Sequence, residues 1–296
     1  MRFTEFGRFA AAAGAAIVAG ALGLHAAQDD TSRAIVPEAF LKARPAAPAK
    51  TTARPVYKRV SSAAEAGRAG ATEIGVTLWR LRPARANDGP RLLVHEAAGA
   101  PSEWTPERAS IDQPLARGDQ VRLSVEAPRA GYLYVIDTEQ YADGTSGAPT
   151  LIFPTKRTRG GDNAVAAGRL IDLPDQDDAP PYFTLQASRA DYAGERLTLI
   201  VTREPIPDLA IGASPIELAR ERAAAWEKRG AGAVERLDLV SGAGRGWTRS
   251  EQAAARGGGA KLTQQDPAPQ TLFRVQAADP GFVSVQVSLS QSGKRQ

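Results

Sequence analysis

The sequence predicts a mostly β protein, an antiparallel β-sandwich of the immunoglobulin-like or jelly-roll-like kind, with two short helices in its C-terminal half. Three observations predict this fold. Short apolar runs recur throughout residues 71–296, several of them alternate apolar with polar side chains, and glycine or proline separates them. Alternation with a period of two is the pattern of a half-buried strand, and many short strands at this spacing are typical of antiparallel sandwiches.

Four long strands are predicted from this alternation: Glu73–Leu81, Val121–Glu126, Leu197–Thr202 and Val283–Leu289. In Val121–Glu126 and Leu197–Thr202 the polar residues are expected to form one face in contact with water. Shorter strands are predicted at Arg91–Val94, Leu151–Phe153, Tyr182–Leu185, Val234–Leu239 and Thr271–Val275.

The strand Gly131–Asp137 differs from these because it is apolar on both faces. Leu133 and Val135 point one way and Tyr134 the other, which predicts a central strand covered above and below. A polar stretch of 13 residues separates Asp137 from Leu151. Because this stretch is longer than an ordinary hairpin connection, we predict a displayed loop and place the working surface in residues 137–163.

Two helices are predicted from their starts. Ser214-Pro215-Ile216-Glu217 and Thr248-Arg249-Ser250-Glu251 have the sequence of a capping box, in which the hydroxyl and the carboxylate satisfy free backbone N–H groups. The first helix is predicted to run to about Arg229 and the second to end at the glycines 257–259. Trp226 and Trp247 are interpreted as core anchors of these helices.

The N-terminal segments predict export. Residues 1–27 carry Arg2 and Arg8 before a short apolar run, the layout of a signal peptide, and cleavage is expected near Ala26 or Ala27. The chain has no cysteine, so disulfides are excluded. We predict an extracytoplasmic location, in the periplasm or secreted, with membrane contact only if the leader is uncleaved.

Residues 28–70, rich in alanine and proline, are interpreted as a disordered basic linker before the domain at 71–296. They hold eight Lys or Arg against four acids, whereas residues 71–296 hold 27 against 28. The positive charge therefore lies outside the predicted fold, which argues against a nucleic-acid partner.

From about Leu115 to Ile206, roughly a third of the chain, the sequence resembles a bacterial family known as domain of unknown function 4384 (DUF4384). The resemblance implies an extracytoplasmic, β-rich module, and it implies no catalytic residue. It rests on these residues: Gly118-Asp119, Gly131-Tyr132-Leu133-Tyr134, Leu151-Ile152-Phe153-Pro154, Asn163, Leu173-Pro174, Phe183, Gly194-Glu195 and Leu197–Val201.

Two groups of residues are candidates for ligand binding. Tyr141, an aromatic residue between acids, is a candidate contact, and Lys156, Arg157 and Arg159 precede two glycines and could bind an anion. The oxygen-rich residues Asp137, Glu139, Asp143 and Asp162 could instead hold calcium, although their spacing is not that of an EF-hand. In the alternative interpretation they cap turns. No other cofactor is predicted.

No catalytic residue is assigned. Outside the leader, His95 is the only histidine, and the chain has no Gly-x-Ser-x-Gly motif. The preferred function is a non-enzymatic binding module of the cell envelope, whose partner is a protein or another envelope component. The alternative is a carboxylate-based hydrolase of envelope polysaccharide that uses the acids of residues 137–143 or Asp172, Asp175, Asp177 and Asp178. Two convergent, buried acids in a cleft would favour the enzyme, and splayed loops would favour the module.

Overall fold

The computed structural model describes residues 37–47, 54–62, 71–95, 101–256 and 259–292. The predicted leader, residues 1–27, lies outside the described residues. The described chain is mostly β, its sheets are antiparallel, and it forms no closed barrel, which confirms the predicted sandwich. No helix in these ranges is both long enough and apolar enough to span a bilayer.

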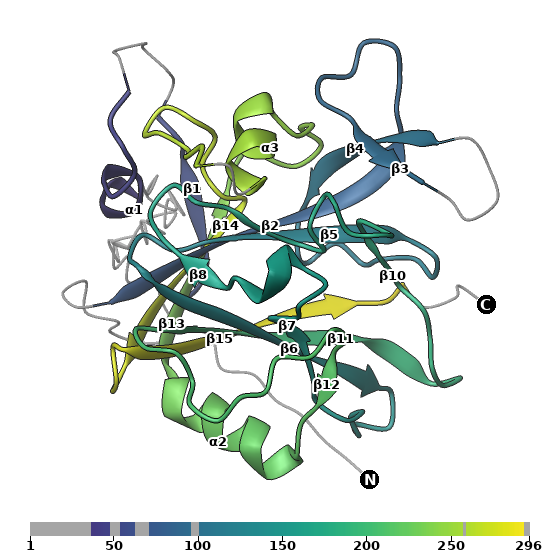
Figure 1. Cartoon of the computed structure of the whole chain (residues 1–296), viewed down its shortest axis with the longest axis vertical. Coiled ribbons are helices and arrows are strands. Elements are labelled where there is room, and N and C mark those ends of the chain that lie inside the picture. The colour runs from purple at the N-terminus through teal and green to yellow at the C-terminus, as the bar shows by residue number, and fades with distance from the viewer. Residues whose placement is uncertain (1–36, 48–53, 63–70, 96–100, 257–258, 293–296) are drawn as a thin grey trace, which may run out of the picture. The chain divides into compact units, whose positions relative to one another are not determined.

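Two sheets make up the sandwich (Figure 1). The first sheet has the order β1 (Tyr57–Ser62), β13 (Gly232–Leu239), β14 (Thr271–Ala277), β2 (Thr72–Pro83), β4 (Ser102–Ala109) and β3 (Leu92–Val94), and β5 (Gln120–Glu126) pairs with β2, β9 (Ile171–Leu173) and β10 (Phe183–Thr184). The second has the order β12 (Ile216–Glu217), β7 (Thr150–Phe153), β6 (Gly131–Tyr141), β11 (Tyr192–Thr202) and β15 (Phe282–Ser290), and β8 (Ala164–Val165) pairs with β6.

The main core lies between the two sheets. Val76 and Leu123 of the first sheet meet Leu133, Leu199 and Val285 of the second in one buried apolar cluster. Each of these side chains lies on the face of its strand that is turned toward the other sheet. Burial of apolar surface at this interface is therefore the main force that holds the sheets together.

Helices cover the outer faces of both sheets. In Figure 1, α3 (Arg249–Ala255) and α2 (Arg220–Gly230) lie on opposite sides of the sandwich. Ala254 of α3 packs with Trp79 and Trp247 on the first sheet, and α2 packs on β15 and β11 of the second. The two predicted helices are confirmed, as is the burial of Trp247; Trp226 is partly buried on the second sheet. The chain also contains α1 (Glu38–Lys42) and a short 3₁₀ turn, η1 (Arg159–Gly161).

The predicted start of the first helix is wrong, whereas that of the second is right. Ile216 lies opposite Leu151, so Ser214–Glu217 contributes a short strand, β12, and not a helical turn. The helix begins six residues later than Ser214, after Ala219, and no side chain caps it. At the second site Thr248 and Glu251 form both halves of the capping box.

The central strand has the predicted two faces but not the predicted length. Leu133 and Val135 face the other sheet, and Tyr134 packs on the opposite face with Leu218 and Ala223. The strand does not end at Asp137, however, but continues to Tyr141 and pairs with β11 along its length. The long displayed loop predicted after Asp137 is thus shortened by four residues of strand, and the turn begins at Ala142.

The interpretation of residues 28–70 as a linker is wrong for the parts that the structure describes. Phe40 and Tyr57 are buried in an apolar cluster, β1 pairs with β13, and the Arg44 side chain is 1% exposed. Composition suggested a spacer because alanine and proline dominate the segment. A few large side chains within it nevertheless bury well in the fold.

The predicted water-facing sides of β5 and β11 are also wrong. Thr198 and Thr202 of β11 are buried, and so are Arg122, Ser124 and Glu126 of β5. Arg122 donates to Asp172 (Nη2–Oδ2 2.8 Å), and Ser124 donates to the same carboxylate (2.5 Å). Burial of charged groups is costly unless they are paired and hydrogen-bonded, and here β9 and the N-terminal segment supply the partners.

Candidate functional site

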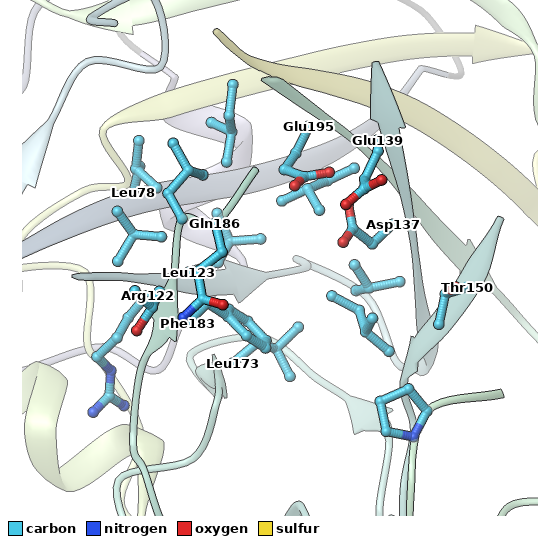
Figure 2. A pocket seen from close by; sticks show the side chains of 18 of the residues that line it. Leu78, Arg122, Leu123, Asp137, Glu139, Thr150, Leu173, Phe183, Gln186 and Glu195 are labelled. Carbon is cyan, nitrogen blue, oxygen red and sulfur yellow. The ribbon is translucent and has the colours of Figure 1, made fainter. Parts of the chain in front are cut away.

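A cavity of about 540 Å³ opens between the two sheets at one end of the sandwich (Figure 2). Its walls are mainly apolar side chains, and exposed residues of the chain stand at its mouth. The apolar walls include Leu78, Leu123, Val135, Leu173, Leu197 and Leu289, and the mouth includes Ala148, Phe183, Thr184, Gln186 and Pro215. This volume is in the range of pockets that hold small molecules.

The alternation of β6 and β11 carries acids into this cavity. The inward face of β6 runs Leu133, Val135, Asp137 and Glu139, so its last two members replace apolar residues by carboxylic acids. On β11, Glu195 lies opposite Glu139 and continues the inward face of Leu197. Figure 2 shows the three acids grouped at one end of the cavity. The core face therefore becomes acidic where the sandwich ends.

Asp137 and Glu195 form a close pair in this acidic end. Burial, and then the neighbouring Asp137 charge, raise the pKa of Glu195 to about 8. Burial raises the pKa of Asp137 to about 6, and a hydrogen bond from Glu195 acts against the rise. At neutral pH Glu195 thus retains a proton and donates it to the Asp137 carboxylate. Two carboxyl groups at such proximity cannot both ionise easily, so they share one proton.

The pair also accepts hydrogen bonds from Tyr192 and from the Thr138 backbone N–H. The Tyr192 hydroxyl donates to Glu195 Oε1 (2.6 Å). Asp137 Oδ1 and Glu195 Oε2, both buried, receive no hydrogen bond from any N–H or hydroxyl group of the described residues. These two oxygens are therefore free to accept a hydrogen bond from a group that enters the cavity.

Tyr141, the predicted aromatic contact, belongs to the rim of this site. Its hydroxyl donates to Glu139 Oε2 (2.5 Å), and Ser188 donates to the same oxygen. The Arg189 guanidinium lies 4.0 Å from the centre of the Tyr141 ring and also donates to Asp143 (3.1 Å). The ring is thus held between an acid and a base.

The predicted cations are not at this site. Lys156 and Arg157 are exposed, and Arg157 and Arg159 line a separate charged depression with Asp175 and Asp178. Arg159 is largely buried and donates to the Ala255 carbonyl (2.9 Å). Its role in the described structure is therefore to fasten η1 to the end of α3.

The four calcium candidates occupy three separate places. Asp137 and Glu139 line the cavity, Asp143 pairs with Arg189 at the hairpin, and Asp162 pairs with Arg169. Within the described ranges, no three His, Cys, Asp or Glu side chains are arranged to hold a metal ion. The alternative interpretation as turn caps fits Asp143, which accepts from the Thr145 N–H (2.8 Å).

Sequence reasoning missed Glu195 as a member of the site. The signal was present, because Glu195 is in phase with Leu197 and Leu199 on an alternating strand and so had to point inward. His95 is exposed at the end of β3, outside the cavity. Of the second acidic group proposed for catalysis, Asp172 is committed to Arg122, and Asp175, Asp177 and Asp178 lie around the charged depression.

Together the fold and the site define an antiparallel β-sandwich with a ligand-sized apolar cavity, whose polar end is formed by Asp137, Glu139 and Glu195. Comparison with protein-family models, with curated proteins and with solved structures found no match. The resemblance to domain of unknown function 4384 therefore stays a prediction.

Proposed function

We propose that the protein is an extracytoplasmic, non-enzymatic binding module of the cell envelope, which holds a small ligand, or the apolar part of a larger protein or envelope component, in the cavity between its sheets. The observation that carries the proposal is the cavity itself. It has about 540 Å³ of space, apolar walls and a few polar groups gathered at one end. Sites that bind small molecules have this composition.

The sequence supports the location. The leader-like residues 1–27 are typical of an exported chain, and the absence of cysteine is compatible with any compartment. Sequencing the N-terminus of the mature protein should place cleavage near Ala26 or Ala27. Recovery of Met1 from an extracytoplasmic fraction would contradict cleavage.

A blocked-mouth variant tests the binding function. Ala148 is exposed and lines the cavity, so Ala148→Trp should obstruct entry without disturbing the core. Ala142 is also exposed, on the same hairpin, but does not line the cavity, and Ala142→Trp is the matched control. Protein incubated with envelope extract and examined by native mass spectrometry should carry a bound species in the wild type and the control. Equal loading of all three proteins, or of none, would contradict the cavity as the binding site.

The convergence of Asp137 and Glu195 favours a second candidate, the carboxylate-based hydrolase of envelope polysaccharide. A carboxyl group with a pKa near 8 is protonated at neutral pH and has the protonation state of a general acid. Glycosidases, however, hold their two carboxyls roughly 5 Å or more apart so that the sugar or water fits between them. Asp137 and Glu195 are in direct hydrogen-bond contact, and we therefore rank the enzyme second.

The hydrolase has its own test. Release of reducing ends from purified envelope polysaccharide would be measured for the wild type and for Glu195→Gln. Activity that Glu195→Gln abolishes would establish the enzyme in place of the binding module. Activity that this variant retains would come from elsewhere.

A further inference from the structure

The cavity contains an excess of acids over bases. Among the described residues that line it are three carboxylic acids, Asp137, Glu139 and Glu195, and one base, Arg122. The Arg122 guanidinium donates to Asp172 and to the Pro174 carbonyl, and Figure 2 shows it directed away from the acids. Arg122 is therefore already neutralised by a different partner, and it does not compensate the acidic end.

The acid pair has acceptor oxygens and lacks a cationic partner. Among the described residues, no Lys or Arg charge is a main cause of the pKa shift of Asp137 or of Glu195. Their oxygens Asp137 Oδ1 and Glu195 Oε2 are buried and have no N–H or hydroxyl donor within the described chain. A single proton between the two carboxyls leaves the pair with one negative charge. That charge lies in an apolar surrounding, where an opposite charge is attracted more strongly than in water.

A primary ammonium group suits this arrangement. It carries three N–H donors and one positive charge, so it can donate to both carboxylates at once and take the place of the shared proton. A neutral hydroxyl supplies one donor and no charge. A carboxylate or phosphate would add negative charge to a site that already holds an excess of it.

The rest of the cavity specifies what the ammonium is attached to. Leu123, Val135, Leu173 and Leu197 line the walls beyond the acids, and Phe183, 39% exposed, stands at the mouth. These side chains offer no hydrogen-bonding group. The body of the ligand should therefore be an apolar chain or ring that buries against them.

We propose that the cavity is a receptor for apolar primary amines, whose ammonium group donates to the carboxyl oxygens of Asp137 and Glu195 and whose apolar body lies along the leucine-lined walls. This inference rests on the proposed binding function and names the class of its ligand. Binding exchanges one cation for another: the ammonium enters, and the shared proton leaves to solvent. Glu139 and Tyr192, the other titratable groups that face the pair, keep their hydrogen bonds to Tyr141 and Glu195.

The test compares three probes of equal length, n-octylamine, 1-octanol and octanoate, by titration calorimetry on the mature chain. We expect octylamine to bind at least about tenfold more tightly than octanol, and octanoate to bind least. Repeating the titration in buffers of different ionisation enthalpy should show release of close to one proton for each amine bound near pH 7. Amine affinity should rise between pH 5.5 and pH 8.5, because the proton competes less while the amine stays charged.

Variants of the two acids test whether Asp137 and Glu195 bind the ammonium group. Asp137→Asn and Glu195→Gln keep the shape of the pair and should each reduce octylamine affinity at least about tenfold, with octanol affinity little changed. Glu204→Gln removes an exposed acid outside the cavity and should bind as the wild type does. Circular dichroism on each variant confirms that it folds.

The outcomes separate this inference from the binding function. Equal affinity for amine and alcohol, or amine binding that both variants retain, would overturn the amine receptor and leave a binding cavity in place. Failure of all three probes to bind would overturn the inference as well. In that case the loading of Ala148→Trp from envelope extract decides whether the cavity binds anything.

Discussion

Arg44 and Glu126 form a buried, two-pronged ion pair that ties the N-terminal segment to β5. Arg44 Nε donates to Glu126 Oε1 (2.8 Å) and Nη2 to Oε2 (2.7 Å), with both side chains at most 2% exposed. The same guanidinium also donates to the carbonyls of Thr263, Asp266 and Pro267. Each nitrogen of the Arg44 guanidinium thus donates a hydrogen bond, and a buried charge is tolerated under this condition.

Loss of Arg44 should therefore be costly. We expect Arg44→Ala to lower the free energy of unfolding by about 3–5 kcal/mol, because Glu126 would be left buried without its partner. The matched control is Lys42→Ala on the same segment, because Lys42 and Glu38 form an ion pair that is exposed to solvent. Urea unfolding should show no measurable change for that control. Similar effects of the two variants would mean that the segment is not docked in solution.

A double variant separates charge from packing. In Arg44→Met with Glu126→Leu both charges are replaced by apolar groups of similar size. We expect it to be more stable than Arg44→Ala, because no uncompensated charge remains. A double variant as unstable as the single one would show that the carbonyl contacts of Arg44, and not its pairing with Glu126, hold the segment.

The two capping-box sequences give a direct comparison of sequence and structure. Thr248 caps α3 and Ser214 caps nothing. Thr248→Ala should therefore cost about 1 kcal/mol of unfolding free energy, within a range of about 0.5–2 kcal/mol. Ser214→Ala should change stability by less than about 0.5 kcal/mol. An equal loss in both variants, measured by chemical denaturation, would restore the predicted helix start at Ser214.

Local sequence could predict the strands and the central position of Gly131–Asp137, because alternation and two-sided apolarity are local properties. It could not predict that Ile216 would pair with Leu151, since strand pairing overrides a capping signal. Arg44 gave no local signal either, because its partner Glu126 is distant in the chain. The acids Asp137 and Glu139 were recognised as candidates. The phase of β11 indicates that Glu195 points inward, but its position opposite Glu139 depends on the register of β6 and β11, which only the fold shows.

The central strand gives a test of the core. Leu133 is fully buried between the sheets, so Leu133→Ala should lower the free energy of unfolding by about 2–5 kcal/mol. Leu93 on β3 is 49% exposed, and Leu93→Ala should change stability by less than about 0.5 kcal/mol. Thermal and urea unfolding of the two variants would check this. A change at position 133 no larger than that at position 93 would contradict the strand assignment.

The acid pair should make stability fall as pH rises. The ordinary pKa values of Asp137 and Glu195, 3.8 and 4.5, rise to about 6 and about 8 in the fold. Between these limits the folded chain binds more protons than the unfolded chain, so the free energy of unfolding decreases with pH from about 4 to about 8 and levels off above. Glu139 adds to the effect through its charge, and Arg122, paired with Asp172, does not offset it.

Removal of the two acids isolates their contribution. From pH 5 to pH 9 the wild type should lose roughly 1–3 kcal/mol more than Asp137→Asn with Glu195→Gln, a value held below the full shift because Glu195 is only partly shielded from water. Above pH 8 the double variant should be the more stable protein, because it does not bury ionised carboxylates that lack a cationic partner. Glu204→Gln should follow the wild-type curve. Urea unfolding at intervals of one pH unit measures the difference between the curves. A difference that does not change with pH would mean that Asp137 and Glu195 do not share a proton in the folded chain.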